Sequence, residues 1–302
     1  MRGQSERDSV VVIGAGLMGT GIAHAFATAG HAVTLVDVSP EALEAATGSI
    51  RKILEGGVQL SKVTEADARA AIERVTTSTE LAGSLRGRKT SLLLETAVES
   101  ITVKKDIVRE ADRLLPDEAV IATNTSALSV TEIAAATGRP DRVIGMHFFN
   151  PVHKMKLLEI VRGMATSDET IARARSWGGS IGKTSILVNE APGLTTSRMS
   201  ALMGNEAMYM LMEGTASAED IDTAMRLGFN HPMGPLELGD LTGWDTRFAV
   251  LKYLHESLGE KFRPCPLIAK LVKAGRLGRK AGKGVYEYVD GQCVPGSGLR
   301  IR

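Results

Sequence analysis

The stretch Val10-Val11-Val12-Ile13-Gly14-Ala15-Gly16-Leu17-Met18-Gly19 decides the fold of the N-terminal part of the chain. Its first four residues are all β-branched, which is typical of a strand that is buried on both faces of a parallel sheet. Three glycines follow in the spacing G-x-G-x-x-G, and apolar residues then recur at helical intervals through Ala27. The stretch therefore predicts a strand, a tight turn and a helix in direct succession.

Each glycine of this stretch has a physical task if the turn binds a dinucleotide. Gly14 permits the tight turn out of the strand, Gly16 lets the backbone approach a pyrophosphate, and Gly19 lets the helix pack closely on the strand. Leu17 and Met18 open the helix, where free N–H groups and the positive end of the helix dipole attract phosphate. We predict that these five residues bind the cofactor within a Rossmann-type fold.

The acidic residue Asp37 indicates which dinucleotide is bound. It ends a second predicted strand, residues 31–36, and follows Gly19 by eighteen residues. A carboxylate at this place contacts the adenosine ribose hydroxyls and repels a 2′-phosphate. The sequence therefore favours NAD over NADP, although a Rossmann-like sheet with an empty pocket stays open as an alternative.

Strand and helix patterns alternate as far as about residue 190. Such alternation predicts a doubly wound α/β domain with a parallel sheet. Residues 41–56 and a segment starting at Thr64 read as an inserted helical hairpin, joined by a turn over 56–62. Further strands are predicted at residues 92–94, 119–122, 143–146 and 157–161.

Ligands in such sheets bind beyond the carboxyl ends of the strands. Polar residues follow three of the predicted strands, in the segments 95–99, 124–126 and 147–150. We expect these three segments to converge on one crevice.

The pattern changes after residues 189–193, where the chain becomes helical and rich in methionine. We predict two domains: an NAD-binding domain over residues 1–190 and an all-α substrate and dimerisation domain over residues 191–302. Long apolar helices in so short a segment favour burial against a second subunit, which predicts a homodimer.

Composition excludes several classes of function. The 302 residues are enough for two domains, and 36 basic against 35 acidic side chains give no reason to expect a nucleic-acid partner. The two cysteines, Cys265 and Cys293, lack metal-ligand spacing, so we expect reduced thiols and no metal.

The polar N-terminus favours neither a signal peptide nor a membrane span, and we expect a cytoplasmic protein.

His147 and Glu159 are the candidate catalytic pair. Oxidation of an alcohol requires a base for the hydroxyl proton, and histidine suits this role because its pKa lies near neutrality. A carboxylate behind the ring fixes its tautomer and stabilises the imidazolium. The two residues are twelve positions apart, and this spacing alone leaves open whether their side chains meet.

Ordered motifs along essentially the whole chain resemble the 3-hydroxyacyl-CoA dehydrogenase family. The most specific is His147-Phe148-Phe149-Asn150-Pro151 with Glu159 downstream. The other matching segments are residues 14–21, 95–105, 124–126, 191–193, 219–222, 231–239 and 278–284.

The resemblance implies reversible NAD-linked oxidation of an L-3-hydroxyacyl-CoA, with short chains such as 3-hydroxybutyryl favoured. It implies that His147 is the general base, that Glu159 orients it, and that Ser126 hydrogen-bonds the substrate. It also implies that Asn150 holds the nicotinamide carboxamide. Further implied NAD contacts are Asp37, Glu99, Lys104 and Lys280, and implied coenzyme A contacts are Ser61 and Lys62.

One departure from the family pattern concerns Ser197. The family usually reads Pro-Gly-Phe-x-x-Asn-Arg after the first domain, whereas residues 192–198 read Pro-Gly-Leu-Thr-Thr-Ser-Arg. The replaced asparagine is implied to help bind the substrate carbonyl and position the base; a serine hydroxyl is shorter but still donates a hydrogen bond. Two alternatives remain open: a dehydrogenase of a free 3-hydroxy acid such as L-gulonate, and a weakly catalytic NAD-binding structural relative.

Overall fold

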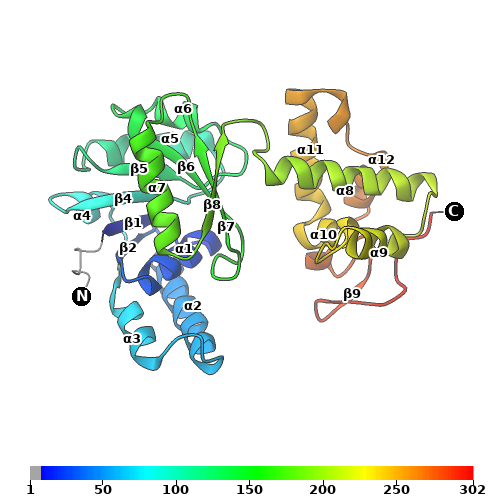
Figure 1. The fold of residues 1–302 in the computed structure, drawn as a ribbon, viewed down its shortest axis with the longest axis horizontal. Coiled ribbons are helices and arrows are strands. Elements are labelled where there is room, and N and C mark those ends of the chain that lie inside the picture. The colour runs from blue at the N-terminus through cyan, green and yellow to red at the C-terminus, as the bar shows by residue number, and fades with distance from the viewer. Residues whose placement is uncertain (1–7, 302) are drawn as a thin grey trace. The chain divides into compact units, whose positions relative to one another are not determined.

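The computed structural model describes residues 8–301, which form two compact units, one ending at Glu190 and one beginning at Ala191. Each unit has its own hydrophobic core. Figure 1 shows the sheet and its covering helices in the first unit and a group of helices in the second. The predicted fold class, a Rossmann-type α/β unit followed by a helical unit, is confirmed.

The first unit is built on one eight-stranded sheet with the strand order β3-β2-β1-β4-β5-β6-β7-β8. The strands are β1 (Ser9–Ile13), β2 (Ala32–Val36), β3 (Val75–Ser78), β4 (Thr90–Glu95), β5 (Val120–Thr123), β6 (Val143–Phe148), β7 (Leu157–Arg162) and β8 (Thr184–Asn189). All neighbouring pairs are parallel except β6 and β7, which run antiparallel. The sheet is therefore mostly parallel, and its one antiparallel pair carries the candidate catalytic residues.

Seven α-helices accompany this sheet in the described part of the first unit. They are α1 (Leu17–Thr28), α2 (Pro40–Gln59), α3 (Glu65–Glu73), α4 (Leu81–Leu85), α5 (Ile101–Asp112), α6 (Val130–Ala134) and α7 (Asp168–Ser180). Ile22 and Phe26 of α1 are fully buried against β-branched and leucine side chains of the central strands. This packing fixes α1 and therefore the glycine turn from which it starts.

The helical hairpin forms as predicted, but its turn is shorter. Helix α2 continues through Gly56 and Gly57 to Gln59, because its apolar face still has partners there: Val58 and Val63 pack against the core. The Thr64 hydroxyl accepts a hydrogen bond from the Asp67 N–H at 3.1 Å, which confirms the expected cap of α3.

Two strands of the first unit, β3 and β8, were not expected from the sequence, and β6 runs further than expected. Strand β3 is mostly polar because it lies at one edge of the sheet, and β8 lies at the other edge. The expected end of β6 at Met146 is wrong, because its antiparallel pairing with β7 continues through His147 and Phe148. His147 is thus a strand residue.

The second unit is helical apart from a two-stranded hairpin. Its helices are α8 (Thr196–Glu213), α9 (Ala218–Gly228), α10 (Pro235–Thr242), α11 (Trp244–Leu258) and α12 (Pro266–Lys273), and the hairpin strands are β9 (Tyr288–Val289) and β10 (Gln292–Cys293). Gly214 ends α8 in the left-handed conformation at φ +73°. The buried Asp240 carboxylate accepts hydrogen bonds from the Val285 and Tyr286 N–H groups, which ties the C-terminal segment to α10.

Within residues 8–301, no helix has the length and apolar character that a membrane span requires.

Candidate active site

The glycine turn between β1 and α1 is shaped by close backbone contacts. A Cβ atom on Gly19 would lie 1.8 Å from the Gly14 carbonyl oxygen, and one on Gly14 would lie 2.9 Å from Thr96. Gly14 also has φ +99°, a conformation that side chains disfavour. By contrast, a Cβ on Gly16 would meet nothing within 4 Å. Gly14 and Gly19 are therefore required by the protein's own packing, whereas Gly16 leaves open space in front of α1.

This open space suits the phosphates of a dinucleotide. Gly16 is the N-cap of α1, a helix whose residues the structure describes throughout. No side chain caps its N-terminus, and no acidic residue lies in its first turn. The N–H groups at the start of α1 therefore remain available to an anion, and the helix dipole favours negative charge there. The residues present fit a bound dinucleotide.

Asp37 lies directly beyond β2, beside the glycine turn. Its Oδ2 accepts a hydrogen bond from the Ala15 N–H at 2.7 Å, and its Oδ1 accepts one from the Ser39 N–H at 3.0 Å. These two bonds hold the carboxylate at the end of β2, where the sequence predicts a contact to the ribose.

His147 and Glu159 face each other across the antiparallel pair of β6 and β7. They occupy directly opposed positions in the register, so their side chains leave the same face of the sheet. His147 Nδ1 and Glu159 Oε2 are 2.6 Å apart, and the Glu159 side chain is fully buried. The sequence left open whether these side chains meet, and the structure brings them together.

The contact with Glu159 assigns the two ring nitrogens different tasks. A buried carboxylate at 2.6 Å accepts a hydrogen bond from Nδ1–H, which leaves Nε2 as the nitrogen that can exchange a proton. The ring also lies 4.7 Å from the Phe149 ring between centroids. A histidine held in this way by a carboxylate is the arrangement of a general acid–base catalyst.

Glu99 shapes the turn that carries Ser126. Its Oε1 accepts hydrogen bonds from the Thr125 hydroxyl at 2.5 Å and from the Ser126 N–H at 3.2 Å. The Ser126 side chain is exposed at the end of β5, so it is available to a ligand. From the sequence, Glu99 was expected to contact NAD only, and its role in fixing this turn was missed.

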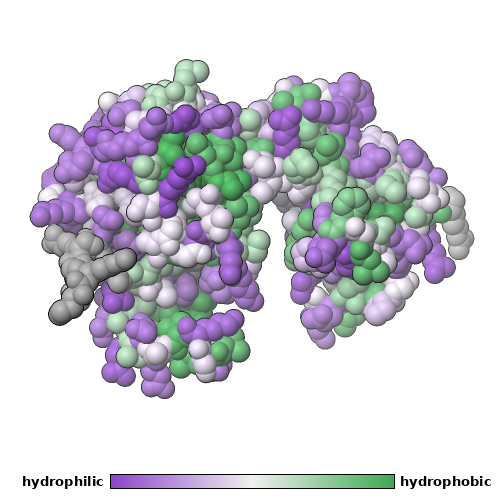
Figure 2. Space-filling view, viewed as in Figure 1, coloured by the Kyte–Doolittle hydropathy of each residue, from purple (hydrophilic) through white to green (hydrophobic). Residues whose placement is uncertain are grey.

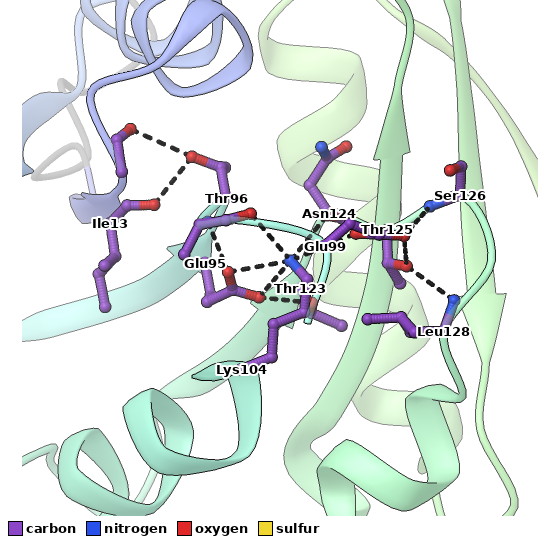
Figure 3. Close-up of polar contacts among 12 residues, drawn as sticks. Ile13, Glu95, Thr96, Glu99, Lys104, Thr123, Asn124, Thr125, Ser126 and Leu128 are labelled. Carbon is purple, nitrogen blue, oxygen red and sulfur yellow. Dashed lines mark hydrogen bonds and ion pairs between the residues drawn. The ribbon is translucent and has the colours of Figure 1, made fainter. Parts of the chain in front are cut away.

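Lys104 is completely buried, and its amine contacts protein acceptors. Its Nζ donates to both carboxylate oxygens of Glu95, at 3.0 and 2.9 Å, and to the Asn124 carbonyl oxygen at 3.2 Å. Figure 3 shows the amine between the ends of β4 and β5, beside Glu95 and Asn124. The structure therefore places Lys104 beneath the predicted site, with its charge neutralised by Glu95.

Glu95, Thr96 and Asn124 lie in the segments 95–99 and 124–126 that were expected to converge, but none of the three was assigned a role of its own from the sequence. The Thr96 hydroxyl donates to the carbonyl oxygens of Ile13 and Gly14, at 2.8 and 3.1 Å, which links β4 to the glycine turn. Their position directly after predicted strands places them at this edge of the sheet, because carboxyl ends of parallel strands gather there, but it does not show which contacts they make.

Asn150 follows β6 and lies beside a cavity of about 300 Å³. The cavity is bounded by the start of α1, by one face of α2 and by the segment 150–153. Its polar lining includes Thr20, Ser49, Asn150 and His153. A small-molecule ligand therefore has room next to the glycine turn.

The remaining predicted site residues lie in separate places. Ser61 and Lys62 form the turn between α2 and α3 in the first unit. Ser197 lies in the first turn of α8, and Lys280 in a short 3₁₀ turn of the second unit, where its Nζ lies 2.7 Å from Asp245 Oδ2. Across residues 8–301, no group of three or more His, Cys, Asp or Glu residues is arranged to hold a metal ion.

Fold and site together define an NAD-dependent dehydrogenase, because a dinucleotide-binding turn and a carboxylate-oriented histidine lie in one Rossmann-type unit. Comparison with known proteins gives the family. Residues 9–191 match the NAD-binding domain of 3-hydroxyacyl-CoA dehydrogenase, and residues 193–288 match the C-terminal domain of the same enzyme. The chain belongs to the 3-hydroxyacyl-CoA dehydrogenase family.

Similar proteins cover nearly the full length. A probable 3-hydroxybutyryl-CoA dehydrogenase of Bacillus subtilis is 44% identical over 94% of this chain and 99% of its own. The 3-hydroxybutyryl-CoA dehydrogenase of Bradyrhizobium diazoefficiens is 44% identical over 95% of this chain and 97% of its own. The crystal structure of (S)-3-hydroxybutyryl-CoA dehydrogenase from Ralstonia eutropha is 42% identical, with a TM-score of 0.90, over 95% of this chain and 100% of that chain.

Proposed function

We propose that the protein catalyses the reversible NAD-linked oxidation of an L-3-hydroxyacyl-CoA to the 3-ketoacyl-CoA, with 3-hydroxybutyryl-CoA as a preferred short-chain substrate. The observation that carries the proposal is the contact between His147 and the buried Glu159 at 2.6 Å. The similarity to 3-hydroxybutyryl-CoA dehydrogenases over nearly the whole chain supports the choice of substrate.

His147 takes the proton of the substrate hydroxyl on Nε2 during oxidation and returns it during reduction. Glu159 stabilises the imidazolium form through its hydrogen bond to Nδ1–H. Ser126, exposed at the end of β5, donates a hydrogen bond to the oxygen of the reacting carbon. NAD, when bound, accepts the hydride from that carbon.

The proposed NAD site uses the glycine turn, with residues 14–19 around the pyrophosphate. Asp37 binds the ribose hydroxyls, and Asn150 binds the nicotinamide carboxamide. Glu99 adds a partly exposed carboxylate, and Lys280, whose amine pairs with Asp245 in the second unit, is proposed as a further NAD contact. Lys104 is fully buried and pairs with Glu95, so we propose that it supports the NAD site through its contacts with the ends of β4 and β5.

Coenzyme A is proposed to bind along the helical hairpin. Ser61 and Lys62 form its turn, between α2 and α3. Burial and the neighbouring Lys154, Lys183 and Lys62 lower the pKa of His153, so the positive charge available to the phosphates of an acyl-CoA comes from lysines such as Lys154 and Lys62.

The decisive test is NADH consumption with acetoacetyl-CoA, run beside free acetoacetate and beside NADPH. We expect rapid turnover only with the thioester and NADH. Turnover of free acetoacetate at a comparable kcat/KM would favour a free 3-hydroxy acid as substrate. Tight NADH binding without turnover of either compound would favour the structural relative.

We also propose a cytoplasmic homodimer assembled through the second unit. Both cysteines are free, as in proteins of a reducing compartment. Large apolar side chains of the second unit are exposed, among them Met199, Leu227 and Phe229. Figure 2 shows hydrophobic residues among hydrophilic ones on the visible face of this unit. Light scattering should give twice the 32.1 kDa chain mass, and a clean monomer would contradict the dimer.

A further inference from the structure

The contact between β5 and β6 continues beyond the last paired residues of the two strands. Their parallel ladder ends with Thr123 opposite Gly145, whereas β6 runs on through His147 to Phe148. At that point the Phe148 N–H donates a hydrogen bond of 2.9 Å to Oδ1 of Asn124. The Asn124 side chain therefore takes the place of a further rung of the ladder, directly beside the candidate base.

The backbone of Asn124 is itself fixed from two sides. Its N–H donates to the Glu95 carbonyl oxygen at 2.8 Å, and its carbonyl oxygen accepts from Lys104 Nζ at 3.2 Å. Lys104 and Glu95 form an ion pair whose two side chains are fully buried (Figure 3). The Thr123 hydroxyl donates to the same Glu95 carboxylate at 2.7 Å. The ion pair thus holds the end of β5 in one position.

We propose that Asn124 is a positioning residue for the general base His147, and that the buried Lys104–Glu95 pair sets the position of Asn124. Hydrogen bonds connect the ion pair to the Asn124 carbonyl oxygen, and the side-chain oxygen of Asn124 to the Phe148 N–H, on the C-terminal side of His147. Glu159 of β7 holds the imidazole ring of His147. Asn124, directly after β5, holds the neighbouring backbone through the Phe148 N–H. The inference rests on the proposed function, because it assigns Asn124 a task in that reaction.

The substitution Asn124→Ala removes the acceptor of the Phe148 N–H, whereas Asn124→Asp keeps an acceptor oxygen at the same place. In the cofactor-free protein, hydrogen exchange measured on residues 146–150 should be at least tenfold faster in the alanine variant. Asn124→Asp should bring the exchange rate back to within about threefold of the wild type.

In the enzyme assay, Asn124→Ala should lower kcat with acetoacetyl-CoA by about 10- to 100-fold, the effect of displacing a catalytic group by a fraction of an ångström to 1 Å. The KM for the thioester and the Kd for NADH should stay within about threefold, because neither ligand is proposed to contact Asn124. Asn124→Asp should recover most of the lost kcat.

The matched control is Asn205→Ala in the second unit. Asn205 is also buried, and its Oδ1 also accepts a backbone hydrogen bond, from the Cys265 N–H at 2.8 Å. This variant should lower the melting temperature, while kcat per folded molecule and the exchange of residues 146–150 stay at wild-type values.

A wild-type kcat in Asn124→Ala, or an equal loss in Asn205→Ala, would overturn the inference. So would unchanged hydrogen exchange at residues 146–150 in Asn124→Ala. Failure of the proposed function is a separate result: the wild type would then not turn over acetoacetyl-CoA, or His147→Gln would remain active.

Discussion

At the scale of single residues, Ser197 is one position where the sequence differs from the pattern of the family that it resembles. It lies in the first turn of α8, where the family pattern has an asparagine. Asparagine reaches further than serine and offers both a donor and an acceptor, so it can contact the substrate carbonyl directly. Ser197→Asn should raise kcat/KM for acetoacetyl-CoA by about tenfold, within the roughly 1–3 kcal/mol of a direct hydrogen bond to developing charge.

Steady-state kinetics of Ser197→Asn beside the wild type decide this point. An unchanged or lower kcat/KM would mean that the surroundings of Ser197 have adapted to the serine. Such a result would favour a substrate that differs from the family's usual one.

His24 is a buried histidine of α1 that the proposed reaction does not use. Its side chain is 8% exposed, and burial lowers its pKa to about 4, with smaller contributions from His153 and Lys183. The pKa in the folded state therefore lies below the ordinary value of 6.5. As the pH falls below 6.5, the unfolded chain gains a proton that the folded chain does not, so the free energy of unfolding decreases until about pH 4.

The His24 contribution can be measured by urea unfolding of the first unit at pH 7.5 and at pH 5. His24 should account for about 2 kcal/mol of the wild-type loss between these values, and His24→Gln should be less sensitive to pH by that amount. His231→Gln, in a turn of the second unit, should keep the full wild-type sensitivity. Equal losses in the wild type and His24→Gln would refute a neutral, buried His24.

At the scale of elements, the glycines of the turn between β1 and α1 serve two different purposes, the packing of the protein and the proposed binding of NAD. Gly19 is needed for packing, because its added Cβ would lie 1.8 Å from a backbone oxygen, whereas Gly16 faces open space. Gly16→Ala should therefore leave the melting temperature within about 2 °C of the wild type but raise the Kd for NADH at least tenfold, because the methyl group occupies the place of the pyrophosphate.

Gly48→Ala is the matched control for this substitution. Gly48 also has open space around its Cβ position, but it lies in α2, where alanine should stabilise the helix by about 0.5–1 kcal/mol. Its Kd for NADH should equal that of the wild type. Wild-type NADH binding by Gly16→Ala, measured by titration calorimetry, would rule out a pyrophosphate at this turn.

The central strands and the dinucleotide turn were predictable because their signals are local. The β-branched run, the three glycines and Asp37 lie within 28 residues of one another. The edge strand β3 was not predictable, because its polar sequence lacks the apolar run of a central strand.

The contacts that Lys104 makes with Glu95 and Asn124 were also not predictable from the sequence. Lys104, Glu95 and Asn124 come from three separate segments, and only the sheet order brings β4 next to β5. On a helix surface, a lysine five residues after Glu99 resembles an ordinary solvated charge. Its complete burial against Glu95 depends on tertiary packing that no spacing in the sequence reveals.

At the scale of the whole molecule, the predicted site residues are divided between two units. The base, its carboxylate and the glycine turn belong to the first unit, whereas Ser197 and Lys280 belong to the second. The family match covers both units, so the proposed enzyme needs the full chain. Chemistry of this kind is helped when the parts of an enzyme close over the substrate and exclude water.

If His147, oriented by Glu159, transfers the proton in the NAD-linked reaction, its replacement should abolish turnover but not NADH binding. The most direct measurement compares the wild type with His147→Gln, for turnover of acetoacetyl-CoA with NADH and for the Kd of NADH. We expect a loss of kcat of at least about 10³-fold with a Kd within about threefold of the wild type, because glutamine fills similar space but exchanges no proton. Substantial turnover by His147→Gln would contradict the assignment of His147 as the general base.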